Sequence, residues 1–204
     1  MDAVYFDLDG TLVEFDRSFV AIVEDAASRL DVDLSDGDVE LFGAALGDHL
    51  ESADDPYAAA AAAADLSADP ESFATAMQDA ELAATVPVAN ATEAVAALAD
   101  DYQLGVLTNG HGPMQRAKVD AGGFGDAFDA VVVSRDVGVG KPDPGIFAAA
   151  EERLPADSYV FVADALDRDV RAAEAAGWRG VYVGDETPED VSHVGSLSAL
   201  PDVV

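Results

Sequence analysis

The sequence contains no cysteine and little positive charge. Its 204 residues include 10 lysines and arginines against 41 aspartates and glutamates, which gives a formal net charge of -31. The absence of cysteine excludes disulfides and thiolate chemistry. The negative charge argues against binding to nucleic acid or to anionic membranes, because both would be repelled. An acidic, lysine-poor and alanine-rich composition resembles that of halophilic proteins, which work in salt that screens self-repulsion.

The sequence also lacks long hydrophobic runs. No uncharged apolar stretch reaches about 18 residues, so we expect no transmembrane helix. The first residues lead directly into an apolar strand, without a basic segment before it, so no signal peptide is expected. Half of the residues are nevertheless hydrophobic, which is enough for a sizeable core. The length suits one domain or a domain with a small addition, and we expect a cytoplasmic protein.

The first segment that indicates chemistry is Asp7-Leu8-Asp9-Gly10-Thr11. It follows a short apolar run, Ala3–Phe6, which is typical of a buried parallel strand. Ligands of open α/β sheets bind just beyond the carboxyl ends of strands, so Asp7 and Asp9 are expected at such an end. Two carboxylates this close repel each other, and a hard cation such as Mg²⁺ relieves the repulsion. The alternative is a turn without a chemical role.

A long insertion separates this segment from the rest of the pattern. In residues 15–86, apolar residues recur with a period near 3.6. We therefore predict four helices there, at 15–30, 38–50, 56–64 and 69–82, and no strand. The flanking parts, 1–14 and 87–204, alternate strand-like and helical segments, which predicts a parallel sheet covered on both faces. The predicted fold is therefore an α/β protein with a Rossmann-like parallel sheet core and an inserted α-helical domain.

Within the second flanking part, predicted helices alternate with predicted strands, and a helix comes first. The strands are expected at 102–107, 130–133, 159–162 and 179–183, and the helices at 91–99, 113–121, 144–154 and 168–176. Asp167 is expected to be the N-cap of the last helix. The tail is expected to add a short strand near Val191 and a turn of helix near Leu197.

Two of these strand ends carry groups suited to an anion. Thr108 and Asn109 precede a glycine turn and a helix, and a hydroxyl with turn amides can hold a phosphate. Lys141 is one of only two lysines and lies between a glycine and a proline on a loop. We therefore expect it to neutralise a phosphate rather than to solvate the surface. Each segment alone is weak evidence, because such sequences also form ordinary turns.

A further strand end supplies a second acidic pair. Asp164 ends an apolar strand, and Asp169 follows five residues later. Together with Asp7 they could supply carboxylates to one Mg²⁺, whose other positions would be filled by water and a phosphate oxygen.

In this order, the four segments resemble the haloacid dehalogenase-like hydrolase superfamily over residues 2–183. The family's Asp-x-Asp-x-Thr pattern is matched by residues 7–11, and its strand-end Thr, its Lys and its acidic pair are matched by Thr108, Lys141, Asp164 and Asp169. Ala163 and Ala165 depart from the Gly and Ser that are usual there. The resemblance implies a core formed by residues 1–14 and 87–204, with residues 15–86 as a helical cap over the site.

The resemblance also implies roles for individual residues. Asp7 is the nucleophile that forms an aspartyl-phosphate, and Asp9 protonates the leaving group and then activates water. Thr108 and Lys141 bind the phosphoryl oxygens, and Asn109 is expected beside Thr108 as a further substrate-binding residue. Mg²⁺ is bound by Asp7, by the main-chain carbonyl of Asp9 and by Asp164, and Asp169 is either a further ligand or a residue that supports the ligands.

The function implied is Mg²⁺-dependent hydrolysis of small-molecule phosphate monoesters. A phosphomutase, a dehalogenase or a non-catalytic binding or regulatory module of the same fold are the alternatives. A dehalogenase would need neither Asp9 nor the acidic pair, and a non-catalytic module would be expected to have lost Asp7, Asp9 or Lys141. The expected partner is a small phosphorylated metabolite, and the substrate itself is not indicated by the sequence.

Overall fold

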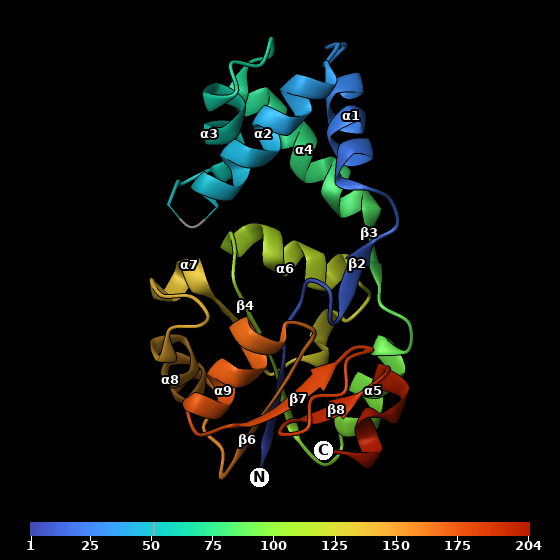
Figure 1. Ribbon diagram of the computed structural model, residues 1–204, viewed down its shortest axis with the longest axis vertical. Coiled ribbons are helices and arrows are strands. Elements are labelled where there is room, and N and C mark those ends of the chain that lie inside the picture. Colours follow the sequence, from blue (N-terminus) through green and yellow to red (C-terminus); the bar gives the residue numbers. More distant parts are fainter. Residues whose placement is uncertain (51) are drawn as a thin grey trace. The chain divides into compact units, whose positions relative to one another are not determined.

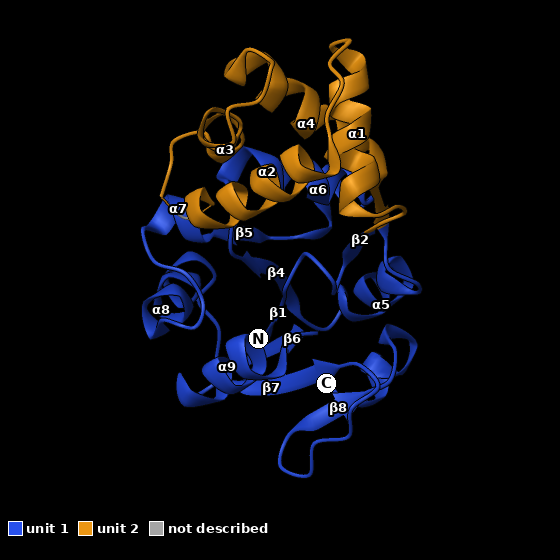
Figure 2. Cartoon of the chain, turned by 45° about the horizontal axis from the view of Figure 1, so that its top comes forward, with its two compact units in different colours: residues 1–14, 87–204 blue, residues 15–86 orange. Residues whose placement is uncertain are grey.

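The computed structural model describes residues 1–50 and 52–204. The chain divides into two compact units, residues 1–14 with 87–204 and residues 15–86, which Figure 2 shows in different colours. The chain passes between the units through two short strands that pair with each other, β2 (Val13–Phe15) and β3 (Thr85–Pro87). The sequence predicted no strand in the insertion, because strands of three residues are too short to show a period of two.

Six parallel strands form the sheet of the first unit (Figure 1), in the order β5-β4-β1-β6-β7-β8, which can be followed in Figure 2. These strands are β1 (Ala3–Phe6), β4 (Gln103–Thr108), β5 (Ala130–Val133), β6 (Tyr159–Ala163), β7 (Arg179–Val183) and β8 (Ser192–Val194). The predicted parallel α/β fold is confirmed. Because β1 lies between β4 and β6, the residues that follow these three strands meet at one edge of the sheet.

Helices cover both faces of this sheet. They are α5 (Ala91–Leu98), α6 (Gly112–Ala121), η1 (Gly125–Ala127), α7 (Ser134–Val137), α8 (Pro144–Arg153), η2 (Leu166–Val170), α9 (Arg171–Ala175) and η3 (Leu197–Asp202). Val4 and Phe6 pack in an apolar cluster with α5 and η3, whereas Ala3 and Tyr5 pack on the other face with α8 and α9. Alternate side chains of β1 are therefore buried on opposite faces of the sheet, as is expected for a central strand of a parallel sheet.

The segment after β6 differs from the helix predicted at 168–176. Residues Leu166–Val170 form a π-helical turn, and the regular helix α9 begins at Arg171. The amide of Val170 donates to the carbonyl of Ala165 at 3.2 Å, which is an i to i+5 hydrogen bond. Asp167 lies inside this wide turn and is not an N-cap, so that prediction was wrong. Single π turns occur frequently at functional sites.

The part of the second unit that the structure describes contains the four predicted helices. They are α1 (Phe19–Arg29), α2 (Asp36–His49), α3 (Pro56–Ala63) and α4 (Pro70–Ala84). Each begins at a Ser or Asp whose side chain accepts a hydrogen bond from the first turn. Their core contains Phe42, whose ring centroid lies 6.3 Å from that of Phe19 and 5.2 Å from that of Phe73. Among the described residues of both units, no helix is long and apolar enough to span a lipid bilayer.

We expect the stability of this fold to depend strongly on salt. The 41 acidic residues outnumber the 10 basic ones, so most carboxylates have no cation to pair with. In molar salt the screening length falls to about 3 Å, and their mutual repulsion is largely removed. The thermal midpoint, followed by circular dichroism, should rise steadily from dilute buffer to molar KCl. The rise should appear with NaCl as well as with KCl, because both screen charge, and an unchanged midpoint would contradict the expectation.

Candidate active site

Asp7 stands buried at the end of β1. Its main-chain amide donates to the carbonyl of Val162 at 2.9 Å, which continues the sheet pattern, and its Oδ1 accepts the Leu8 amide at 2.8 Å. The chain then turns at Gly10, which has φ +84°. A Cβ at this position would lie 2.3 Å from Oδ2 of Asp164. Glycine is therefore required both by the turn and by the close approach of the second acidic segment.

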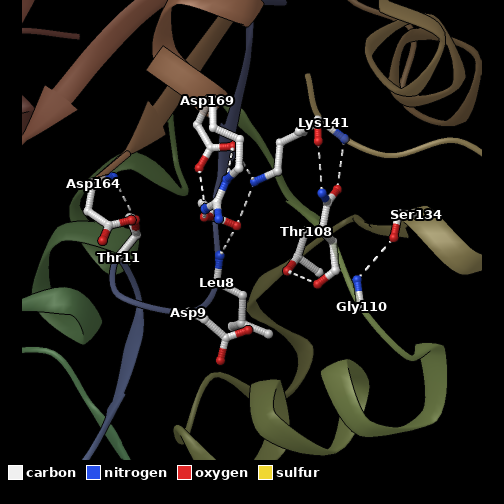
Figure 3. Close-up of polar contacts among 12 residues, drawn as sticks. Leu8, Asp9, Thr11, Thr108, Gly110, Ser134, Lys141, Asp164 and Asp169 are labelled. Carbon is white, nitrogen blue, oxygen red and sulfur yellow. Dashed lines mark hydrogen bonds and ion pairs between the residues drawn. The ribbon is translucent and has the colours of Figure 1, made fainter. Parts of the chain in front are cut away.

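Lys141 bridges two buried carboxylates. Its Nζ lies 2.8 Å from Oδ1 of Asp7 and 3.1 Å from Oδ1 of Asp169. Figure 3 shows the side chains of Lys141 and Asp169 directed toward one another. The ammonium also lies 5.0 Å from the centroid of the Phe161 ring. Buried charges persist only where they are paired, so this arrangement fixes a cation next to Asp7.

The end of β4 holds Lys141 in place. The side-chain amide of Asn109 donates to the Lys141 carbonyl at 3.0 Å and accepts from the Lys141 amide at 2.8 Å. The amide of Gly110 donates to Oγ of Ser134 at 3.0 Å. The side chain of Asn109 thus orients the lysine, and its contact with a substrate stays a prediction. Thr108 is buried beside it at the end of the strand.

Asp9 is held by two residues of helix α6. Lys118 Nζ lies 2.9 Å from Asp9 Oδ1, and Gln115 Nε2 donates to Asp9 Oδ2 at 2.6 Å. Gln115 Nε2 also donates to Oγ1 of Thr108 at 2.9 Å. One amide therefore connects the expected proton donor with the expected phosphate-binding hydroxyl. Figure 3 shows Asp9 lying apart from Asp164 and Asp169.

Three carboxylates form a group that could hold a cation. Single oxygens of Asp7, Asp164 and Asp169 all lie within 4.8 Å of one another. Thr11 fixes Asp164, because its hydroxyl donates to Oδ1 at 3.1 Å and accepts the Asp164 amide at 3.0 Å. Carboxylate oxygens are the ligands that Mg²⁺ and Ca²⁺ prefer. The side chain of Asp9 is not in the group, and metal binding by its main-chain carbonyl stays a prediction.

The buried carboxyls of Asp7 and Asp169 differ in how well their surroundings stabilise the negative charge. Burial raises the pKa of Asp7 to about 6, and the charge of Lys141 opposes that rise. Burial also acts to raise the pKa of Asp169, but a hydrogen bond from Arg168 and the charge of Lys141 outweigh it and lower that pKa below its ordinary value. Asp7 is therefore the first of the pair to gain a proton as the pH falls.

Three residues of this site were not predicted from the sequence: Gln115, Lys118 and Arg168. The Arg168 guanidinium contacts both Asp169 and Asp7. Gln115 could not have been found, because a single polar residue in a helix does not indicate a functional site. Lys118 could have been found, because the chain has only two lysines and both are buried in this site. The same scarcity that singled out Lys141 applies to it equally.

Comparison with known proteins places the chain in a family. The family model of the haloacid dehalogenase-like hydrolases matches residues 1–177. A phosphoserine phosphatase from Thermus thermophilus is 39% identical over 82 residues, which cover 39% of this chain and only 33% of that protein.

Solved structures agree over almost the full chain. The HAD-hydrolase YfnB from Bacillus subtilis, bound to magnesium, has a TM-score of 0.75 and 19% identity, covering 98% of this chain and 97% of the other. The L-2-haloacid dehalogenase from Xanthobacter autotrophicus has a TM-score of 0.70 and 24% identity, covering 98% and 96%. At these identities the likeness shows the fold alone. The fold and the family match together show that the chain belongs to the haloacid dehalogenase-like hydrolases.

Proposed function

We propose that this protein is a Mg²⁺-dependent phosphatase that hydrolyses small phosphate monoesters through an aspartyl-phosphate on Asp7. The observation that carries the proposal is the buried Asp7–Lys141–Asp169 arrangement beside Asp164. It combines a nucleophile, a fixed cation and a set of oxygen ligands at one sheet edge. Phosphoryl transfer requires mainly positioning and charge neutralisation, and these groups supply both.

In the first step, a carboxylate oxygen of Asp7 attacks the phosphorus of the substrate. The new O–P bond forms as the bond from phosphorus to the ester oxygen breaks, and the leaving oxygen takes a proton from Asp9. Lys141 and the hydroxyl of Thr108 hold the phosphoryl oxygens. Gln115 and Lys118 keep the Asp9 carboxyl oriented during the transfer.

In the second step, the Asp9 carboxylate takes a proton from water, which attacks the phosphorus of the aspartyl-phosphate. The bond from phosphorus to the Asp7 oxygen breaks, which restores the Asp7 carboxylate and releases inorganic phosphate. Asp9 therefore serves as acid and then as base, so each turnover returns it to its starting state.

The donor set fits a magnesium ion. Asp7, Asp164 and Asp169 would hold it, since their oxygens converge and carry net negative charge that two cations only partly offset. When bound, the ion would neutralise charge on the transferring phosphoryl group. We propose that residues 15–86 act as the cap that selects the substrate, as expected for an inserted unit in this family.

Specific residues favour this function over its alternatives. Displacement of a halide needs no proton donor, so the anchoring of Asp9 by Gln115 and Lys118 would serve no purpose in a dehalogenase. The buried ion pairs around Asp7 argue against a non-catalytic module, because such charges are costly to retain without a role. A phosphomutase would use the same groups and would differ in transferring the phosphoryl group to a second hydroxyl.

The direct test is a screen of phosphate esters with Mg²⁺ in molar KCl, with release of inorganic phosphate as the readout. Release that depends on Mg²⁺ supports a phosphatase. Isomerisation of sugar phosphates without phosphate release would favour the mutase. No turnover of any ester, together with halide release from 2-haloacids, would replace the proposal by dehalogenation.

Asp164→Asn should weaken Mg²⁺ binding, because it removes one negative ligand from the three-carboxylate group. Loss of a residue that only supports a ligand already costs about 10–100-fold in affinity, so we expect a loss of at least about tenfold. Isothermal titration measures it. Asp167→Asn is the matched control, since it removes the same charge from an exposed position outside the group. Unchanged affinity in Asp164→Asn would show that Asp164 is not a ligand.

A further inference from the structure

We infer that the guanidinium of Arg168 competes with Mg²⁺ for the carboxylates of Asp7 and Asp169, and that it moves away from them when Mg²⁺ binds. The inference rests on the magnesium site proposed above and adds a competitor to it. No feature of the sequence indicates this role of Arg168, which is inferred from the contacts of its side chain in the structure.

Two of the three contacts of Arg168 lie on oxygens that Lys141 leaves open, and the third is on an oxygen that both cations contact. Its Nη2 lies 2.8 Å from Oδ2 of Asp169 and 3.5 Å from Oδ2 of Asp7. Its Nε donates to Oδ1 of Asp169 at 3.2 Å. Lys141 contacts the Oδ1 atoms of the same two carboxylates. Arg168 therefore contacts two residues of the three-carboxylate group, through oxygens that would otherwise be open to a metal ion.

The charges of the site favour the exchange. With Arg168 in place, the carboxylates of Asp7, Asp164 and Asp169 face two cations, Lys141 and Arg168, and one negative charge is left over. With Arg168 withdrawn, a divalent ion and Lys141 together would balance the three carboxylates. The exchange would therefore remove an unpaired negative charge from the cluster.

The two cations differ in their freedom to leave. The side chain of Lys141 is 1% exposed, and its main chain is clamped by Asn109. The side chain of Arg168 is 53% exposed, and it reaches the carboxylates from the π-helical turn at the solvent side. A half-exposed guanidinium can return to water at small cost, whereas a buried ammonium cannot. Arg168 is the cation that exchanges.

The consequence is a lowered affinity for the metal. The ion must replace the contacts of Arg168 with Asp169 and Asp7 before it gains its ligands. Replacing Arg168 by a neutral side chain should therefore tighten Mg²⁺ binding. It should also destabilise the metal-free protein, because two buried carboxylates would then share one cation.

The experiment compares wild type, Arg168→Gln and Arg171→Gln in molar KCl, by titration with Mg²⁺ and by thermal midpoints with EDTA or excess Mg²⁺. We expect Arg168→Gln to bind Mg²⁺ about tenfold more tightly than wild type, the lower end for charged hydrogen bonds at a half-exposed group. Its midpoint should fall in EDTA and recover with Mg²⁺. Arg171 pairs with Asp167 and Asp190 outside the site, so Arg171→Gln should behave like wild type.

The outcomes separate this inference from the proposed function. Equal or weaker Mg²⁺ binding by Arg168→Gln, while wild type binds the ion, overturns the exchange and leaves the phosphatase proposal intact. Binding of Mg²⁺ by neither protein overturns the magnesium site itself and the exchange with it. Tighter binding with a larger Mg²⁺-induced shift in midpoint supports the exchange, whatever the activity of the variant.

Discussion

Asp7→Asn should abolish turnover of p-nitrophenyl phosphate, because an amide cannot attack phosphorus to form the covalent intermediate. Replacing the nucleophile of a covalent mechanism can cost up to about 10⁶-fold in rate. The change keeps the shape of a side chain that is only 3% exposed. It also leaves Asp169 to pair with both Lys141 and Arg168. We therefore expect a folded protein with no activity, measured by phosphate release at saturating Mg²⁺.

The fold of this variant must be checked separately from its activity. A thermal midpoint in molar KCl close to that of wild type would show that the loss is chemical. Asp136→Asn is a suitable control, because it breaks an exposed ion pair with Arg116 and leaves the site untouched. Full activity of Asp7→Asn would contradict the covalent mechanism.

Asp9→Asn should slow alkyl phosphates far more than activated esters. It keeps the nucleophile and removes a proton donor and base, a role worth about 10²–10⁴-fold. p-Nitrophenolate leaves without a proton, so the first step on p-nitrophenyl phosphate should be nearly preserved. An alkyl phosphate should lose rate in the first step, because its alkoxide must be protonated. Rapid-quench kinetics of the phosphorylation step on both esters measures the difference.

The same variant should accumulate its covalent intermediate, since the second step also needs Asp9. A burst of p-nitrophenolate followed by slow turnover is the expected pattern. Lys118 can still donate to the oxygen of the new amide and hold it in place, whereas the new NH2 group cannot accept the hydrogen bond that Gln115 donates to Asp9. Equal losses on the two esters, without a burst, would contradict the acid and base roles of Asp9.

Much of the fold could be predicted because buried parallel strands leave a clear trace. Four apolar runs end abruptly at polar residues, Asp7, Thr108, Ser134 and Asp164, and the helices between them follow a period near 3.6. Strand order and pairing then bring polar ends to one edge. The π-helical turn at Leu166–Val170 was missed, since its sequence fits an ordinary helix.

The site was predicted only in its strand-end residues. Asp7, Lys141 and Asp169 are in contact, as the sequence indicated. Asp7 follows β1, Asp169 lies in the turn after β6, and Lys141 lies on the loop between β5 and α8. The support around them was not foreseen. Gln115 and Lys118 lie three residues apart on one face of α6, and helical spacing alone does not tell whether that face meets a core or a carboxylate.

The most direct test of the account is to locate the phosphoryl group. Asp9→Asn would be mixed with p-nitrophenyl phosphate and Mg²⁺, quenched in acid and examined by intact-mass and peptide-mass analysis. The account predicts one added phosphoryl group on the peptide that contains Asp7, and none when Asp7→Asn is combined with Asp9→Asn. A burst of product without a phosphorylated protein, or a phosphoryl group on any other residue, would contradict it.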